Sequence, residues 1–444
     1  MPWNLVFWLC LGGVAVLVVV QPSWNYPGSA WVRRLSDGPV RWYLFGFPAT
    51  VVRMFYTWRR LCVETGLAVM KRSKSVVLGG DLLVSGAELR PTVPRLGIPR
   101  PTPTGLKVRV QMEPGQTPAQ YLAAADAMAH AWQAHAVRVV SPRRGWVLAT
   151  MTARDPLTGD GGSQVPGPPR LLTAVVGRTE DGGPWVMDFR MVPHWLVVGA
   201  TRSGKSTLIA SLVFALAPQA VALVGVDCKG GMELSLFEPR LSALARDRRE
   251  AAALLRALVD EIEVRMDTCR AVGARSIWEL GDGVRPVPLV VLVDEVAELY
   301  LSDGSREDKQ LSSACSTAML RLGQLGAALG LHLVVAGQRV GSELGPGVTA
   351  LRAQLGGRIC HRVNDEQTAL MVLGDLSPDA VAVAQSIGED EQGVAVTTVG
   401  GVWMRARSTH TTAEQARHTA GTFAKRTPGL PRLVQAIHHV REAA

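Results

Sequence analysis

A glycine-rich segment in the middle of the chain ends in a lysine and a serine, at a spacing that can bind the phosphates of a nucleoside triphosphate. The segment from Gly199 to Ser206 reads GATRSGKS and matches the pattern GxxxxGK[ST]. In such a loop the backbone N–H groups face the phosphates, Lys205 would reach the β- and γ-phosphates, and the Ser206 hydroxyl would ligate Mg²⁺. The sequence therefore predicts ATP and Mg²⁺ as cofactors. The expected ATP-binding residues are Gly199, Ala200, Thr201, Arg202, Ser203, Gly204, Lys205, Ser206 and Thr207.

Two adjacent carboxylates follow a run of branched apolar residues. Leu289–Val293 reads LVVLV, which is typical of a strand buried on both faces, and Asp294 and Glu295 come directly after it. An acid at this end of a buried strand is where P-loop enzymes hold Mg²⁺, so Asp294 is expected to share the ion with Ser206. Glu295 is then the expected base that polarises the attacking water. A solvated helix cap is the alternative for this acidic pair, and the P-loop in the same chain favours the catalytic interpretation.

Another apolar run, Leu333–Ala336, ends in Gly337 and Gln338. If this strand neighbours the strand before the P-loop, Gln338 would lie beside the γ-phosphate and sense it. Gln338, Lys205 and Glu295 are therefore predicted catalytic residues.

The elements that carry these residues alternate between strands and helices. Leu196–Val198 precedes the P-loop and Thr207–Leu216 follows it as an apolar helix, while Val221–Val226 is a further strand. Residues 247–271 carry an apolar stripe at helical spacing. This alternation predicts an α/β fold with a parallel, doubly wound sheet.

The motifs together resemble the FtsK/SpoIIIE family of DNA-pumping motors, over about residues 170–405. The further matching segments are Gly177–Gly182, Asp227–Leu234, Leu322–Arg339, Arg358–Val363 and Leu373-Gly374. The resemblance implies a RecA-like fold, a homo-oligomeric ring expected to be a hexamer, and ATP-driven translocation of double-stranded DNA. It also implies an arginine that reaches the γ-phosphate of a neighbouring subunit, with Arg358 as first choice and Arg362 as second. A salt bridge or a surface position is an equally open interpretation of either arginine.

The N-terminal part carries the signs of a membrane attachment. The run Leu5–Val20 is apolar apart from two glycines, no charged residue precedes Arg33, and residues 1–110 contain 14 Lys or Arg but 4 Asp or Glu. These features predict a transmembrane helix within residues 1–30, with the rest of the chain on the cytoplasmic side of the cell membrane. A cleaved signal peptide is the alternative, but it would require a basic start. The stretch 42–58 is either a second span or a helix lying in the membrane interface.

The whole chain then divides into six predicted segments. The N-terminal anchor and the small domain in the middle of the chain resemble the transfer proteins of actinobacterial plasmids and integrative elements. The expected segments are an anchor at 1–30, a basic juxtamembrane segment and Pro-rich linker at 31–104, a small α/β adaptor domain at 105–157, a flexible linker at 158–170, the P-loop motor at 171–410 and a short helical tail at 411–444.

The leading functional hypothesis is a membrane-anchored, ATP-driven translocase of double-stranded DNA that moves plasmid or integrative-element DNA between cells. One alternative is a chromosome pump at division or sporulation, which would be favoured by a DNA-reading winged helix. The 411–444 tail is short for such a module. The other alternative is a protein-secretion motor of the type VII kind, whose chains usually carry several ATPase modules.

Overall fold

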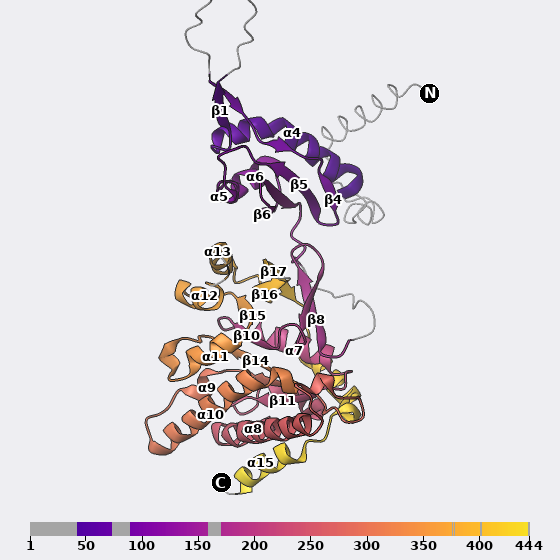
Figure 1. Ribbon diagram of the computed structural model, residues 1–444, viewed down its shortest axis with the longest axis vertical. Helices are drawn as coiled ribbons and strands as arrows, with labels where there is room; N and C mark the ends of the chain where they lie inside the picture. The colour runs from indigo at the N-terminus through magenta and orange to yellow at the C-terminus, as the bar shows by residue number, and fades with distance from the viewer. Residues whose placement is uncertain are drawn as a thin grey trace, which may run out of the picture. The chain divides into compact units, whose positions relative to one another are not determined.

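The computed structural model describes residues 42–72, 89–158, 170–374, 376, 378–399 and 402–442. The predicted anchor at 1–30 and almost all of the predicted linker at 158–170 lie outside these ranges. The chain forms two compact units, with the division in the sequence between Pro156 and Leu157, and Figure 1 labels many of their elements. Among the described helices, none combines the length and the apolar character needed to cross a bilayer.

The small unit is an antiparallel sheet covered on one face by helices. The sheet order is β3-β5-β7-β6, with β4 paired to β5 on the same side as β3, and β1 and β2 form a separate hairpin. The helices are α4 (Phe47–Glu64), preceded by the π-helical turn η2 (Trp42–Gly46), α5 (Pro118–Ala123) and α6 (Ala125–Trp132). The strands are β1 (Val69–Arg72), β2 (Leu89–Thr92), β3 (Arg95–Leu96), β4 (Arg100–Thr102), β5 (Gly105–Gln111), β6 (Ala136–Arg143) and β7 (Trp146–Thr152).

The small unit begins earlier in the chain than residue 105, so the predicted boundary is wrong. Met54 and Trp58 of α4 are buried in one cluster with Val108 of β5 and Trp132 of α6. The segment predicted as a Pro-rich linker instead supplies β2, β3 and β4. Prolines are tolerated there because short edge strands leave backbone positions that need no N–H donor.

The motor unit contains a ten-stranded sheet in the order β12-β11-β13-β14-β10-β15-β16-β17-β8-β9. The first six strands in this order, which end with β15, are parallel, as predicted. The remaining four strands pair in antiparallel fashion. These strands are β8 (Thr173–Thr179), β9 (Pro184–Asp188), β10 (His194–Val198), β11 (Ala222–Val226), β12 (Leu241–Ala245), β13 (Leu289–Val293), β14 (Leu331–Gly337), β15 (Gly357–His361), β16 (Val394–Val399) and β17 (Val402–Ser408).

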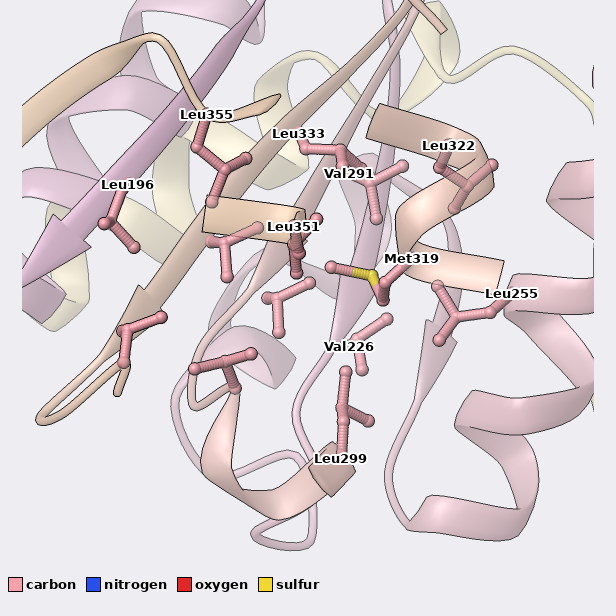
Figure 2. Packing of buried hydrophobic residues seen from close by; sticks show 14 of the residues in the cluster. Leu196, Val226, Leu255, Val291, Leu299, Met319, Leu322, Leu333, Leu351 and Leu355 are labelled. Atoms are coloured by element: carbon pink, nitrogen blue, oxygen red, sulfur yellow. The ribbon is translucent and has the colours of Figure 1, made fainter. Parts of the chain in front are cut away.

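Helices cover both faces of this sheet. Along β10, Leu196 and Val198 belong to one buried cluster and Trp195 and Val197 to the other, as the two-residue period of a strand requires. Figure 2 shows the first cluster, where side chains of the sheet meet those of the α8, α10 and α11 helices. The helices are α7 (Lys205–Leu216), η3 (Leu234–Arg240), α8 (Arg248–Ala271), η4 (Ile277–Glu279), α9 (Ala297–Tyr300), α10 (Arg306–Leu325), η5 (Ala327–Leu329), η6 (Ser342–Leu344), α11 (Val348–Gln354), α12 (Glu366–Leu373), α13 (Pro378–Ser386), α14 (Ala413–Thr422), η7 (Ala424–Arg426) and α15 (Pro431–Glu442).

The C-terminal helices are part of the motor unit, so the predicted separate tail from residue 411 is a second wrong boundary. Leu433 and Ile437 of α15 are buried in the same cluster as the central strands. Arg441 also donates to the buried carboxylate of Glu250 on α8, with an Nε–Oε1 distance of 2.6 Å. An amphipathic helix of this kind is stable because its apolar stripe is covered by the domain.

Candidate nucleotide-binding site

The P-loop leaves the carboxyl end of β10 and is fixed between the two strands that flank it. The Gly199 N–H donates to the carbonyl of Gly337 at 3.2 Å, and the Ala200 N–H donates to the carbonyl of Arg362 at 2.8 Å. A Cβ on Gly199 would lie 2.4 Å from Ser203 Oγ, and Gly204 adopts a φ of 112° against the backbone of Gly393. Only glycine fits these two positions, which explains the glycines of the motif.

Lys205 lies at the start of α7, and its ammonium folds back on the loop. It donates to the carbonyls of Gly199 and Ala200, the second at 3.3 Å. Burial lowers the pKa of Lys205, and the nearby carboxylates of Glu295 and Asp294 oppose this shift. The ammonium of Lys205 is therefore held against the loop, where a bound triphosphate would supply the counter-charge.

Ser206 and Asp294, the two predicted magnesium ligands, line one cavity of about 140 Å³ together with Glu233. Burial, followed by the charges of Asp227 and Glu233, raises the pKa of Asp294 to about 6. A hydroxyl and a carboxylate suit Mg²⁺, which takes few protein ligands and completes its shell with phosphate oxygens and water. Within the described ranges, no group of three or more His, Cys, Asp or Glu could hold a metal through protein ligands alone. The donor set therefore fits Mg²⁺ bound with ATP.

Glu295 and Gln338 meet at the carboxyl edges of β13 and β14. The backbone N–H of Gln338 donates to Glu295 Oε1 at 3.3 Å, and the Glu295 side chain is almost completely buried. The strand β14 pairs directly with β10, which is the condition on which the prediction for Gln338 depended. The charge of Glu295 also acts on Lys205 of the loop, so the carboxylate lies near the lysine that is expected to reach the γ-phosphate. The role of Glu295 as the base stays a prediction.

Lys229 was not singled out from the sequence, and it reaches the same carboxylate. Its Nζ lies 3.6 Å from Glu295 Oε2. The segment that carries it is folded around Asp227, whose carboxylate accepts the N–H groups of Glu233 and Leu234 at 2.9 and 3.1 Å. The sequence signal that could have indicated Lys229 is the Lys-Gly-Gly segment shortly after Asp227. The contact of Lys229 with Glu295, however, depends on β11 and β13 being neighbours.

Arg358 does not lie at the P-loop of its own chain. It is paired in register with Leu196, two residues before the end of β10, and its Nη2 donates to the carbonyl of Arg352 at 3.0 Å. Arg362, the second choice, does lie at its own loop, where its Nη2 donates to the carbonyl of Thr201 at 3.4 Å. A role of Arg358 toward a neighbouring subunit stays a prediction.

Two family models match the chain. Residues 30–153 match the actinomycete conjugal transfer protein N-terminal domain, and residues 167–287 and 281–342 match the FtsK/SpoIIIE family. A transfer protein, TraSA, of Streptomyces ambofaciens is 45% identical over 361 residues, which are 78% of this chain and 85% of that protein. The chain belongs to the FtsK/SpoIIIE family. The predicted membership is thus confirmed.

A second curated relative and one solved structure extend the comparison. A sporulation regulatory protein of Streptomyces azureus is 46% identical over 256 residues, 57% of this chain and 84% of that protein. The pCW3 conjugation coupling protein TcpA, in a monomer form with ATPγS, superposes with a TM-score of 0.52 at 19% identity and covers 75% of this chain and 93% of that one. The likeness to TcpA concerns the fold alone.

Proposed function

We propose that this chain is an ATPase that moves double-stranded DNA between cells during conjugation. The observation that carries the ATPase activity is the convergence of Lys205, Ser206, Asp294 and Glu295 at one edge of the motor sheet. Lys205 binds and orients the β- and γ-phosphates, while Ser206 and Asp294 would hold the cation. Mg²⁺, when bound, neutralises charge on the phosphates. Glu295 accepts a proton from the attacking water.

DNA as the cargo is supported by the family and by the names of its members. Relatives at 28–30% identity are DNA translocases, and TraSA of Streptomyces ambofaciens is a transfer protein. The match of residues 30–153 to the actinomycete conjugal transfer protein N-terminal domain, together with the 45% identity to TraSA, favours transfer between cells over chromosome partition. A ring of subunits, with six as the expected number and Arg358 contributed by the neighbour, is part of this proposal.

The test of the cargo is the ATPase rate of the full chain in detergent with and without DNA. Linear double-stranded DNA is expected to raise the rate several-fold, since the motor would do work only on its track. The matched controls are single-stranded DNA of the same length and a secreted-protein signal peptide. Stimulation by the peptide and none by double-stranded DNA would replace the DNA motor with a secretion motor.

The small unit supports the further proposal that the chain lies at the cell membrane. One stripe of α4, which includes Met54 and Trp58, is buried in the unit. The opposite stripe would be polar in an ordinary surface helix. Here it presents Phe55 and Tyr56 to solvent, 53% and 88% exposed, with Val52 at 63%. Aromatic residues on an outward stripe beside arginines are typical of a helix that lies in the headgroup region of a bilayer.

A fluorescent probe on α4 tests this membrane contact. The environment-sensitive dye NBD, attached to a cysteine introduced at Val52 in the full chain, is expected to shift to the blue and to be quenched by doxyl-labelled lipid in phosphatidylglycerol vesicles. The same probe at Ser141, an exposed residue of β6, is the control and should stay water-like. Shielding of the Val52 probe without lipid quenching would mean that another protein segment covers this stripe.

A further inference from the structure

The sheet of the small unit has one covered face and one open face. Leu106, Val108 and Val110 of β5 point to the covered face and are buried with α4 and α6. Lys107 and Arg109 alternate with them, are exposed and therefore point to the open face. Figure 1 shows α4, α5 and α6 beside the strands that they cover.

The register of the strands gathers cations on the open face. Directly paired residues of antiparallel strands lie on the same face. Lys107 pairs with Arg100 on β4 and with Thr150 on β7, and Thr150 pairs with Arg138 on β6. A second row crosses the sheet from Arg95 on β3 through Gln111 on β5 and Trp146 on β7 to Arg143 on β6. A cation therefore lies at each end of this row. The six cations that share the open face are Arg95, Arg100, Lys107, Arg109, Arg138 and Arg143.

No acid balances these charges within the sheet. The five strands β3 to β7 contain no Asp or Glu, so every ionisable side chain that they carry is Lys or Arg. In the described part of the chain, five of the six cations make no ion pair, and the same five are exposed. These five are Arg95, Arg100, Lys107, Arg109 and Arg143. A face with unbalanced positive charge of this density attracts a polyanion.

We propose that this open sheet face binds the phosphate backbone of double-stranded DNA. The proposal rests on the proposed function for the identity of the cargo, and it adds a second contact outside the motor. Neighbouring strands lie about 4.8 Å apart and alternate residues of a strand about 6.8 Å apart, so the cations form a grid rather than a single point charge. Thr150 and Gln111 add hydroxyl and amide groups among them, and such groups commonly donate to phosphate oxygens.

The same face is poorly suited to a lipid surface. Its large apolar members, Val140, Trp146 and Leu148, are half-buried, whereas five of its cations are exposed. The residues that suit insertion into a bilayer, Phe55 and Tyr56, lie on α4, which covers the other side of the sheet. The small unit therefore has two separate surfaces, one that suits a membrane interface and one that suits a polyanion. Because contacts to phosphates carry no sequence information, the sheet would bind DNA without sequence preference. The open face lies outside the nucleotide-binding motor, so this contact would require no ATP.

Salt-dependent DNA binding by the full chain without nucleotide tests the inference. The variant Lys107→Gln with Arg109→Gln removes two cations from the open face. The matched control, Arg59→Gln with Arg60→Gln, removes two exposed cations from α4 of the same unit. If both face cations contact phosphates, the slope of log affinity against log salt should shrink by about 1.8 and the affinity at low salt should fall by at least ~10-fold. The control should keep the slope of the wild type.

A second face variant, Arg95→Gln with Arg143→Gln, guards against a folding defect, since both residues lie on the surface at the ends of strands. It should lower the slope in the same way, with an unchanged thermal transition. Equal slopes for both face variants and the wild type, while DNA still stimulates the ATPase, would overturn this inference and leave the proposed function standing. Weaker binding to phosphatidylglycerol vesicles with unchanged DNA binding would also overturn it, because the face would then be a lipid contact. Absence of any DNA binding or stimulation in the wild type would instead remove the proposed function.

Discussion

Replacing Glu295 with glutamine is expected to lower the rate of ATP hydrolysis by about 10²- to 10⁴-fold while ATP binding persists. The amide has the shape of the carboxylate, and its oxygen can still accept the N–H of Gln338, which now lies 3.3 Å from Glu295 Oε1. It cannot accept a proton from water, so the chemical step loses its base. Hydrolysis is measured under single-turnover conditions, and binding is measured with a fluorescent ATP analogue.

The matched control for this change is Glu298→Gln, three residues further along the chain. Glu298 is only half-buried, and its backbone carbonyl rather than its carboxylate accepts the hydrogen bond from Arg248. Its amide variant should hydrolyse ATP at close to the wild-type rate. If Glu295→Gln also turned over normally, the base would have to be sought elsewhere. The Glu295→Gln protein with ATP bound is also the form in which to measure the mass of the assembly, where a monomer alone would contradict a ring.

The central part of the site was predictable because its signals are local. The P-loop needs glycines at fixed offsets, since Gly199 and Gly204 have no room for a Cβ. The acids after β13 follow from an apolar run long enough to be read as a buried strand. Gln338 required one extra assumption, that its strand lies beside β10, which the register of β10 and β14 satisfies.

The remaining features depend on contacts between distant segments, which residue spacing does not reveal. The antiparallel strands β16, β17, β8 and β9 complete the motor sheet from both ends of the motor sequence. The helix α4 resembles a membrane segment because Val52, Phe55 and Tyr56 are exposed on its outer side, although its other side is buried in a protein core. The cations of the small sheet are scattered in sequence from Arg95 to Arg143, and only the strand register places them on one face.

Lys205→Ala is expected to remove ATP binding itself rather than the chemical step. The ammonium is held over the loop by the carbonyls of Gly199 and Ala200, so it is positioned before the nucleotide arrives. Loss of a buried, hydrogen-bonded cation from a charge pair costs about 3 kcal/mol, which corresponds to roughly 100-fold weaker binding. Equilibrium binding of a fluorescent ATP analogue measures this loss, and the thermal transition without nucleotide shows whether the loop still folds.

Arg202→Ala is the control for Lys205→Ala, because it removes one positive charge from the same loop. Arg202 is exposed and already adopts a φ of 62°, so alanine meets the same backbone strain as arginine. Its effect on affinity should be several-fold smaller than that of Lys205→Ala. Equal losses in the two variants would mean that the loop acts through its overall charge, not through an ammonium aimed at the phosphates. Because Glu295→Gln should keep ATP and Lys205→Ala should lose it, the two variants together separate the residue that binds the triphosphate from the residue that hydrolyses it.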